Sequence, residues 1–232
     1  MSEFLPIILS ITDTPLFGIV LSLLTYALGL WLNQKAKSPL VNPMLISVGL
    51  IIAVLLLFGI PHEHFQHGGE VIELFLTPAT AVLSIRVYEH FRLLKKNWIP
   101  VLVGAAVGSL VSILCVLFFC RLFHFDAVLT TSLLPKSVTT AIAVPLSAQN
   151  GGIPSITAAA LLVTGMLGAI FAPYLVRLFR IKNPVEAGIA IGTSSHALGT
   201  SKALEMGDIE GAMSGCAIGI AGLFTVIFLM FF

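Results

Sequence analysis

The chain has 232 residues, of which 57% are hydrophobic and 10% are charged, and its mean hydropathy is +1.04. Soluble domains carry about 25% charged residues, so this composition excludes a water-soluble globule. The net charge of +1 excludes the basic surface of a nucleic-acid-binding protein, and the 16 phenylalanines exclude an intrinsically disordered chain. The composition predicts a polytopic membrane protein.

Long apolar runs define the predicted membrane segments, because a helix needs about 20 mainly apolar residues to cross the hydrocarbon core. The segments lie near residues 15–32, 44–60, 71–88, 98–120, 127–148, 155–179, 185–206 and 210–232. Their apolar runs are continuous and not alternating, which excludes a β-barrel. We predict an all-α polytopic membrane protein with about 7–8 hydrophobic segments, forming a single integral membrane domain over residues 1–232.

Three of these segments contain proline, glycine, serine, threonine and charged residues in mid-span. They are the runs at 71–88, 127–148 and 185–206. Irregular backbone at membrane depth is tolerated only where protein buries it or where it lines a watery cavity. We therefore expect discontinuous or re-entrant helices that mark a pocket or a path.

Two of the polar segments resemble copies of one unit. A shift of 56 positions places the run that starts at Ser137 over the run that starts at Thr193. Ala141, Gly151 and Ile153 then fall on Ala197, Gly207 and Ile209. Internal duplication of this kind is common in secondary transporters, and the shift predicts a repeat.

Basic residues give a partial topology. They follow the first, third and sixth segments, as Lys35 and Lys37; Arg92, Lys95 and Lys96; and Arg177, Arg180 and Lys182. The positive-inside rule makes all three connections cytoplasmic, which simple alternation of spans does not allow. The conflict disappears if residues 127–148, bracketed by Pro135 and Pro145, enter and leave by one face. Residues 193–206 would then dip from the opposite face, as an inverted pair.

Polar residues around the two expected breaks suit a small anion. A half-helix N-terminus carries a partial positive charge that attracts carboxylates, and both breaks add hydroxyls and a cation. The candidate binding residues are Lys136, Ser137, Thr139, Thr140, Ser194, Ser195, His196, Thr200 and Lys202.

Each candidate also has a structural interpretation. Serine and threonine in membrane helices often bond their own carbonyls or bridge neighbouring helices. Lys202 could reach an interface or pair with Glu205, three positions on. His196 could couple transport to protons, or it could be a neutral histidine that donates to a backbone carbonyl and orders the broken helix. For Arg86 and Glu89 we favour structural pairing.

A short connection holds His62, Glu63, His64, His67 and Glu70, which could supply metal ligands. We interpret it as a hydrophilic loop and expect no metal site. The sequence has no nucleophile elbow and no phosphate-binding glycine-rich loop. We therefore expect no enzymatic activity, no cofactor and no primary pumping.

Three stretches resemble the LrgB/CidB family: LLPKSVTTAIAV at 133–144, GGIPSITAAALLVTGMLGAI at 151–170 and GTSSHALGTSKALEMGDIEGAMSG at 192–215. The resemblance extends to Asn42-Pro43 and to LTPAT at 76–80, and it adds Thr80 to the candidate site. The chain departs from many members at Ala141 and Arg86, where those members have proline.

The resemblance implies two functions. Bacterial members were described as antiholin-like or holin-like regulators of murein hydrolase activity and cell lysis, encoded beside a small LrgA/CidA-type membrane protein. Plant relatives are plastid glycolate/glycerate translocators, and some bacterial members are linked to pyruvate transport. A confined cationic, hydroxyl-lined site suits a compact monocarboxylate better than a lysis pore. We expect a monocarboxylate transporter or facilitator in the bacterial cell membrane. Its expected partners are a small organic anion, the lipid bilayer, an LrgA/CidA-type protein and further copies of itself, with no nucleic acid.

Overall fold

The computed structural model describes residues 9–36, 41–75, 78, 81, 85 and 88–231, and every regular element within them is a helix. Four of these helices are long and apolar enough to cross a membrane. They are α2 (Pro15–Ala36), α7 (Trp98–Leu122), α10 (Pro154–Leu178) and α12 (Asp208–Leu229). The predicted all-α polytopic membrane fold is confirmed. The chain divides into two compact units, residues 1–82 and 83–232, and each is described by itself.

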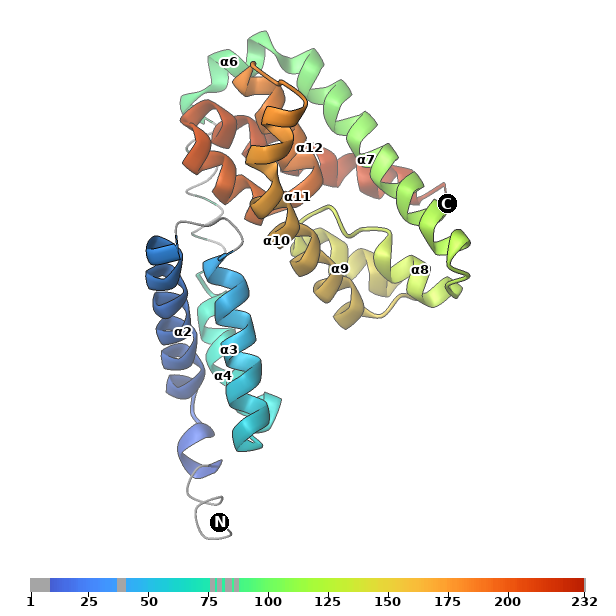
Figure 1. Cartoon of the computed structure of the whole chain (residues 1–232). Helices are drawn as coiled ribbons and strands as arrows, with labels where there is room; N and C mark the ends of the chain where they lie inside the picture. Colours follow the sequence, from blue (N-terminus) through green and yellow to red (C-terminus); the bar gives the residue numbers. More distant parts are fainter. Residues whose placement is uncertain are drawn as a thin grey trace. The chain divides into compact units, whose positions relative to one another are not determined.

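The N-terminal unit packs α2 against α3 (Pro43–Phe58) and α4 (His62–Glu73), drawn in blue to green in Figure 1. Glycine permits the closest approach, because a Cβ atom at Gly18 of α2 would lie 2.9 Å from the Cα of Gly68 in α4. The hydroxyls of Thr25 in α2 and Ser47 in α3 lie 2.8 Å apart. Small residues and a buried hydroxyl pair thus hold these helices together.

The prediction of a hydrophilic loop at residues 62–70 is wrong, because the histidine-rich stretch forms α4. The small and apolar residues of α4 pack on α2, and this packing stabilises a helix in a polar stretch of sequence. His64 Nδ1 lies 3.0 Å from the Thr12 hydroxyl, and His67 Nδ1 lies 3.3 Å from a carboxylate oxygen of Asp13. Within the described part of the chain, no three metal-ligating side chains come together.

Half of the third predicted segment, 71–88, lies outside the described residues, including Thr80 and Arg86. The C-terminal unit continues with α6 (Phe91–Lys96), α7, α8 (Ala127–Leu133), α9 (Thr140–Gln149), α10, α11 (Pro184–Met206) and α12. Neither 127–148 nor 185–206 crosses this unit as one straight rod.

The first polar segment forms a hairpin, named here hairpin one, from α8, the irregular residues 134–139 and α9 (Figure 1). Its tip reaches the middle of α7, where the hydroxyls of Ser137 and Ser112 lie 2.6 Å apart. Its two arms then meet the start of α10. Thr157 Oγ1 lies 2.8 Å from the Ser132 carbonyl oxygen and 2.7 Å from the Ser147 hydroxyl. Both ends of the hairpin therefore lie near the C-terminus of α7 and the N-terminus of α10.

The second polar segment, α11, is also a hairpin, named here hairpin two. Its backbone breaks at His196, where φ is 41° and ψ is −142°. A Cβ at Gly188 would lie 2.5 Å from the Glu210 carbonyl oxygen, and one at Gly211 would overlap the Leu204 side chain. Residues 188 and 204 would be about 24 Å apart on a straight helix, yet both contact the first turn of α12. The two halves of α11 therefore fold back on each other.

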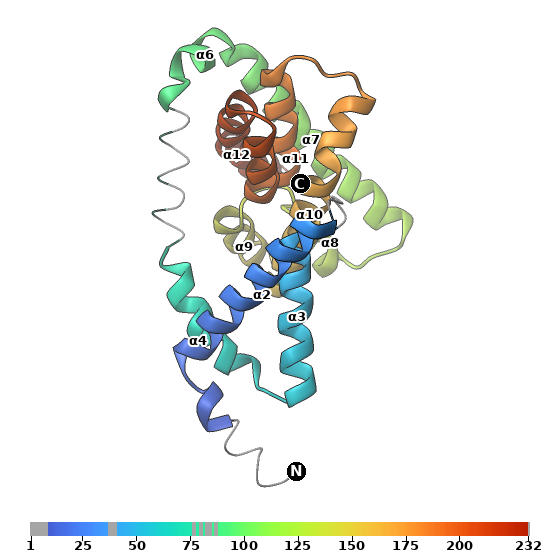
Figure 2. The same cartoon turned by 60° about the vertical axis from the view of Figure 1, so that its left-hand side comes forward.

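The two hairpins belong to an inverted repeat. Adding 56 to the residue numbers of α7 gives those of α10, since Trp98 corresponds to Pro154 and Leu122 to Leu178. His124 and Arg180, which end the two helices, correspond as well, and both have a φ of 54°. The break at His196 corresponds to Thr140, the first residue of α9. Because α7 and α10 run in opposite directions, hairpins one and two enter from opposite ends of the unit (Figure 2). The repeat predicted from the 56-residue shift is present, and so is the inverted pair predicted from the positions of the basic residues.

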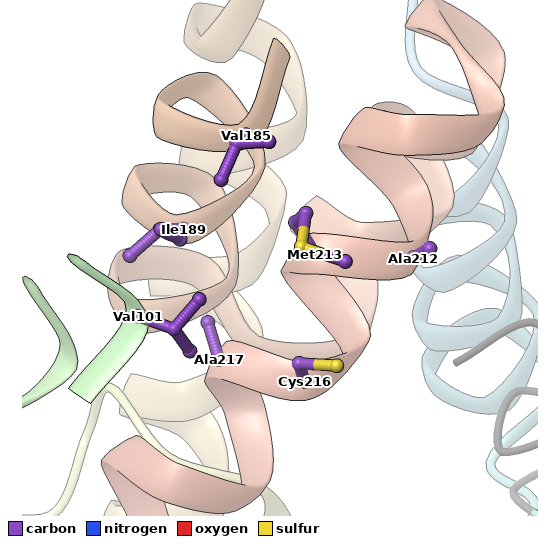
Figure 3. Packing of buried hydrophobic residues seen from close by; sticks show 7 residues of the cluster. All are labelled: Val101, Val185, Ile189, Ala212, Met213, Cys216 and Ala217. Carbon is purple, nitrogen blue, oxygen red and sulfur yellow. The ribbon is translucent and has the colours of Figure 1, made fainter. Parts of the chain in front are cut away.

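An apolar cluster holds the base of hairpin two. Val185 and Ile189 of α11 pack with Val101 of α7 and Met213 and Ala217 of α12 (Figure 3). Leu93 and Leu94 of α6 pack against the same cluster. The basic residues of α6 and those after α10 therefore lie at one end of the unit, which the positive-inside rule makes cytoplasmic.

Candidate functional site

A groove of about 650 Å³ lies between α7, the first half of hairpin two and the tip of hairpin one. Its polar lining consists of Ser112, Lys136, Ser137, Glu186, Thr193 and Ser194. Pro100 and Glu186 line it at the base of hairpin two, and Lys136 lines it at the tip of hairpin one. The groove therefore extends along α7 from the base of hairpin two to the tip of hairpin one.

One stripe of α7 forms a wall of this groove, because Gly104, Gly108 and Ser112 recur every fourth residue and share a face. A Cβ at Gly104 would lie 3.0 Å from the Ile189 side chain, and one at Gly108 would lie 2.5 Å from Cγ2 of Thr193. The two glycines bring hairpin two against the helix backbone. Ser112, one turn later, bonds the tip of hairpin one.

Lys136 is the cation of the groove. Its Nζ donates to the Ser137 hydroxyl over 3.4 Å, and no carboxylate in the described part of the chain forms an ion pair with it. Ionisable groups inside a membrane segment are costly and are commonly functional, so Lys136 is suited to meet an anion.

The tips of both hairpins meet at one residue of α10. The Leu161 side chain packs with Val138 of hairpin one, and its carbonyl oxygen accepts a hydrogen bond of 2.9 Å from His196 Nε2. Gly165, one turn later, leaves room for the imidazole, since a Cβ there would lie 2.6 Å from its Cε1 atom. Leu161 therefore links the two breaks through its side chain and its backbone.

The structure brings three of the predicted site residues into the groove: Lys136, Ser137 and Ser194. Ser195 is buried against Gly168, and its hydroxyl lies 3.0 Å from that of Ser194. These contacts keep Ser195 beside the groove but out of its lining.

Three further candidates from the second break form hydrogen bonds or an ion pair with other residues of the chain. Thr200 is fully buried, donates to the His196 carbonyl over 3.0 Å and lies 2.7 Å from the Ser214 hydroxyl. His196 is bonded to α10 as described, which matches the histidine that orders a broken helix. Lys202 Nζ lies 2.6 Å from a carboxylate oxygen of Glu205, so the structure has the structural pairing considered for these two residues.

The remaining candidates lie elsewhere. Thr139 is the N-cap residue of α9 and Thr140 is exposed at its first position, and neither lines the groove. Thr80 lies outside the described residues. No ligand tests the assignment of any of the ten candidates, which stays a prediction.

Sequence reasoning left Thr193, which lines the groove, out of the candidate site, and it missed the wall formed by Gly104, Gly108 and Ser112. A spacing of four between small residues is typical of close helix contacts in membranes. That spacing was the available signal for the wall. Thr193 lay within the polar run, but its direction depends on the fold.

Sequence comparison identifies the family of the chain. Residues 22–232 match the LrgB-like family. The chain belongs to this family. Antiholin-like protein LrgB of Bacillus subtilis (strain 168) is 37% identical over 217 residues, which cover 93% of the chain and 94% of the relative.

Two other LrgB relatives are similarly close. Those of Bacillus cereus (strain B4264) and Bacillus anthracis (strain CDC 684 / NRRL 3495), also named antiholin-like, are 36% identical over 222 residues, with 95% and 96% of the two chains covered. No solved structure matches the chain. Its bacterial relatives and long apolar helices make this LrgB-like chain a multi-pass protein of the bacterial membrane.

Proposed function

We propose that this LrgB-like chain is a secondary transporter or facilitator of small monocarboxylates of the pyruvate, glycolate or lactate type. The observation that carries the proposal is the meeting of two inverted hairpin tips at Leu161, beside a groove that contains Lys136. This cation has no ion-pair partner among the described residues. Secondary transporters commonly place their substrate site between inverted repeats, at discontinuous helices.

The charges of the groove support a single negative charge on the substrate. Lys136 is the cation of the lining, and Glu186 adds a carboxylate at the base of hairpin two. A monocarboxylate can pair with the ammonium, with the neighbouring hydroxyls of Ser137 and Ser194 as further donors. A dicarboxylate would leave its second charge without a cation and closer to Glu186.

The position of the groove supports alternating access. It reaches the base of hairpin two, near the end that carries the basic residues, while Val138, Ala143 and Leu161 form an apolar cluster around the tip of hairpin one. Exposure to the opposite side requires the hairpins to move against the long helices. Rigid-body movement of one repeat against the other is the usual mechanism in such folds.

Uptake into proteoliposomes tests the proposal. We expect labelled pyruvate, glycolate or lactate to enter liposomes that contain the purified chain, and we expect Lys136→Gln to reduce uptake about tenfold or more, because a lost charge-assisted bond costs about 1.5–3 kcal/mol. Lys182→Gln is the matched control and should stay within about twofold, because Lys182 is exposed and does not line the groove. Absence of uptake of all three acids, under both proton and sodium gradients, would contradict transport.

A second candidate function follows from the relatives, which are named antiholin-like. A regulator of murein hydrolase activity and cell lysis should alter autolysis or release dye-sized solutes, and neither effect should depend on Lys136 or His196. Autolysis assays with Lys136→Gln and His196→Ala therefore separate the two functions.

Partners form part of the same proposal. From the family resemblance, we propose that the chain binds an LrgA/CidA-type small membrane protein and forms a homo-oligomer. Co-reconstitution with such a protein is the appropriate second arm of the uptake assay, because a missing subunit would also abolish transport. Crosslinking in membranes measures the oligomeric state.

A further inference from the structure

Thr193 has a hydroxyl without a partner on the wall of the groove. The residue is 5% exposed, and its Oγ1 has no hydrogen-bond partner among the described residues. Its methyl group faces α7, because a Cβ at Gly108 would lie 2.5 Å from Cγ2 and 4.0 Å from Oγ1. A buried polar group without a partner is destabilising, so this hydroxyl calls for an explanation.

The other helical hydroxyls show what Thr193 lacks. Serine and threonine in helices usually bond a carbonyl one turn earlier. Thr25, Thr130, Thr131, Ser132, Thr200 and Ser201 all do so here. Thr193 has the same option at Ile189 and does not take it.

The inverted repeat gives Thr193 a counterpart in hairpin one. Thr193 corresponds to Ser137 under the 56-residue shift, and both line the groove. Ser137 bonds Ser112 of α7 over 2.6 Å. The residue of α10 that corresponds to Ser112 is Gly168, which has no hydroxyl. Gly168 packs against the Ser195 side chain, whereas Thr193 packs against Gly108 of α7. The two equivalent hydroxyls therefore have different surroundings, and only the hydroxyl of Ser137 has a partner among the described residues.

We propose that Thr193 is a specificity-determining residue, whose hydroxyl bonds the oxygen on carbon 2 of a small acid while Lys136 pairs with its carboxylate. This inference rests on the proposed function and extends it. The contact recognises the oxygen on carbon 2 that pyruvate, glycolate and lactate share. The hydroxyl is buried in this conformation, so the ligand reaches it when hairpin two shifts against α7.

A comparison of lactate with propionate isolates this contact, because propionate has the same charge and chain length but no oxygen on carbon 2. The assay measures kcat/KM of both acids in proteoliposomes for the wild type, Thr193→Val and Thr193→Ser. Valine keeps the shape of threonine and removes the hydroxyl. We expect Thr193→Val to lower the lactate-to-propionate ratio by between about 3- and 10-fold through lactate alone. Thr193→Ser should keep the ratio within about twofold.

Thermal unfolding separates this role from a structural one. Thr193→Val removes an unpartnered buried hydroxyl, so its Tm should equal or exceed that of the wild type. Thr200→Val is the matched control. Its hydroxyl is equally buried but bonds His196 and Ser214, so its loss should lower the Tm.

The outcomes distinguish a failure of the role proposed for Thr193 from a failure of the proposed transport function. If Thr193→Val leaves the ratio unchanged, or slows both acids equally, the inference on Thr193 is overturned while transport stands. A Tm lowered to the level of Thr200→Val would likewise show a structural hydroxyl. If the wild-type chain moves neither acid, the proposed function fails and the role of Thr193 fails with it.

Discussion

His196 at the tip of hairpin two donates a hydrogen bond of 2.9 Å from Nε2 to the carbonyl oxygen of Leu161 in α10. The bond crosses 35 positions of sequence and fixes which ring nitrogen carries the proton, since a carbonyl can only accept. It also holds a residue whose positive φ is unfavourable for a non-glycine side chain. The strained tip is therefore fastened to the same residue that packs on hairpin one.

We expect His196→Ala to lower the free energy of unfolding by about 1–3 kcal/mol, because it leaves the Leu161 carbonyl buried without a donor. His196→Gln should retain most of the stability and most of the uptake, since its amide can donate from nearly the same place. Thermal unfolding in detergent and uptake with and without a proton gradient measure both effects. If His196→Gln were stable but no longer responded to the gradient, His196 would be a proton-coupling group, contrary to this prediction.

Gly108 of α7 provides a second prediction, on the contact between α7 and hairpin two. A Cβ at this position would lie 2.5 Å from Cγ2 of Thr193. That methyl group belongs to a β-branched side chain that is stiff in a helix. We expect Gly108→Ala to destabilise the protein by about 1–3 kcal/mol and to reduce uptake several-fold.

Gly219 of α12 is the matched control, because a Cβ there would meet nothing within 4 Å. Gly219→Ala should be neutral or should stabilise the protein by about 0.5–1 kcal/mol, as expected in a helix interior. Equal effects of the two substitutions on the Tm would contradict the close packing of α7 against hairpin two.

Both breaks and the inverted repeat could be predicted because each has a signal in the local sequence. Proline, glycine and hydroxyl residues in mid-span are incompatible with a lipid-facing rod, and the 56-residue shift repeats the order of the elements. The sequence signal for helix α4 is weaker. Its stability comes from packing against α2, where Gly68 faces Gly18, and a polar run in isolation does not reveal that contact.

The direction of each side chain could not be predicted. Both lysines follow a predicted break, yet the fold places them differently. Lys136 lies in the groove, whereas Lys202 pairs with Glu205. The partner of His196 is a backbone carbonyl, and every residue has one, so no residue type identifies it. The bonded state of Thr200 and the unbonded state of Thr193 likewise depend on distant elements that only the fold brings near.

The orientation in the membrane is a further prediction. Residues 98–178 contain two long helices that run in opposite directions, with hairpin one between them. A reporter fused after Gly151 should therefore appear outside the cell, and one fused after Lys182 should appear in the cytoplasm. Paired enzymatic reporters that are active on one side only measure this. A cytoplasmic signal after Gly151 would contradict the re-entrant arrangement in the membrane.

Cys115 offers a test of water in the groove. It lines the groove and is exposed, whereas Cys120 and Cys216 are buried. Maleimides react with the thiolate, which needs water to form, so an exposed thiol that faces only lipid should react as slowly as a buried one. We expect N-ethylmaleimide to modify Cys115 alone in proteoliposomes, to inhibit uptake, and to react more slowly when lactate is present. Cys115→Ser should transport normally and resist inhibition. If Cys115 reacts no faster than Cys120 and Cys216, the groove is dry, and Lys136 would have no aqueous route by which to meet an anion.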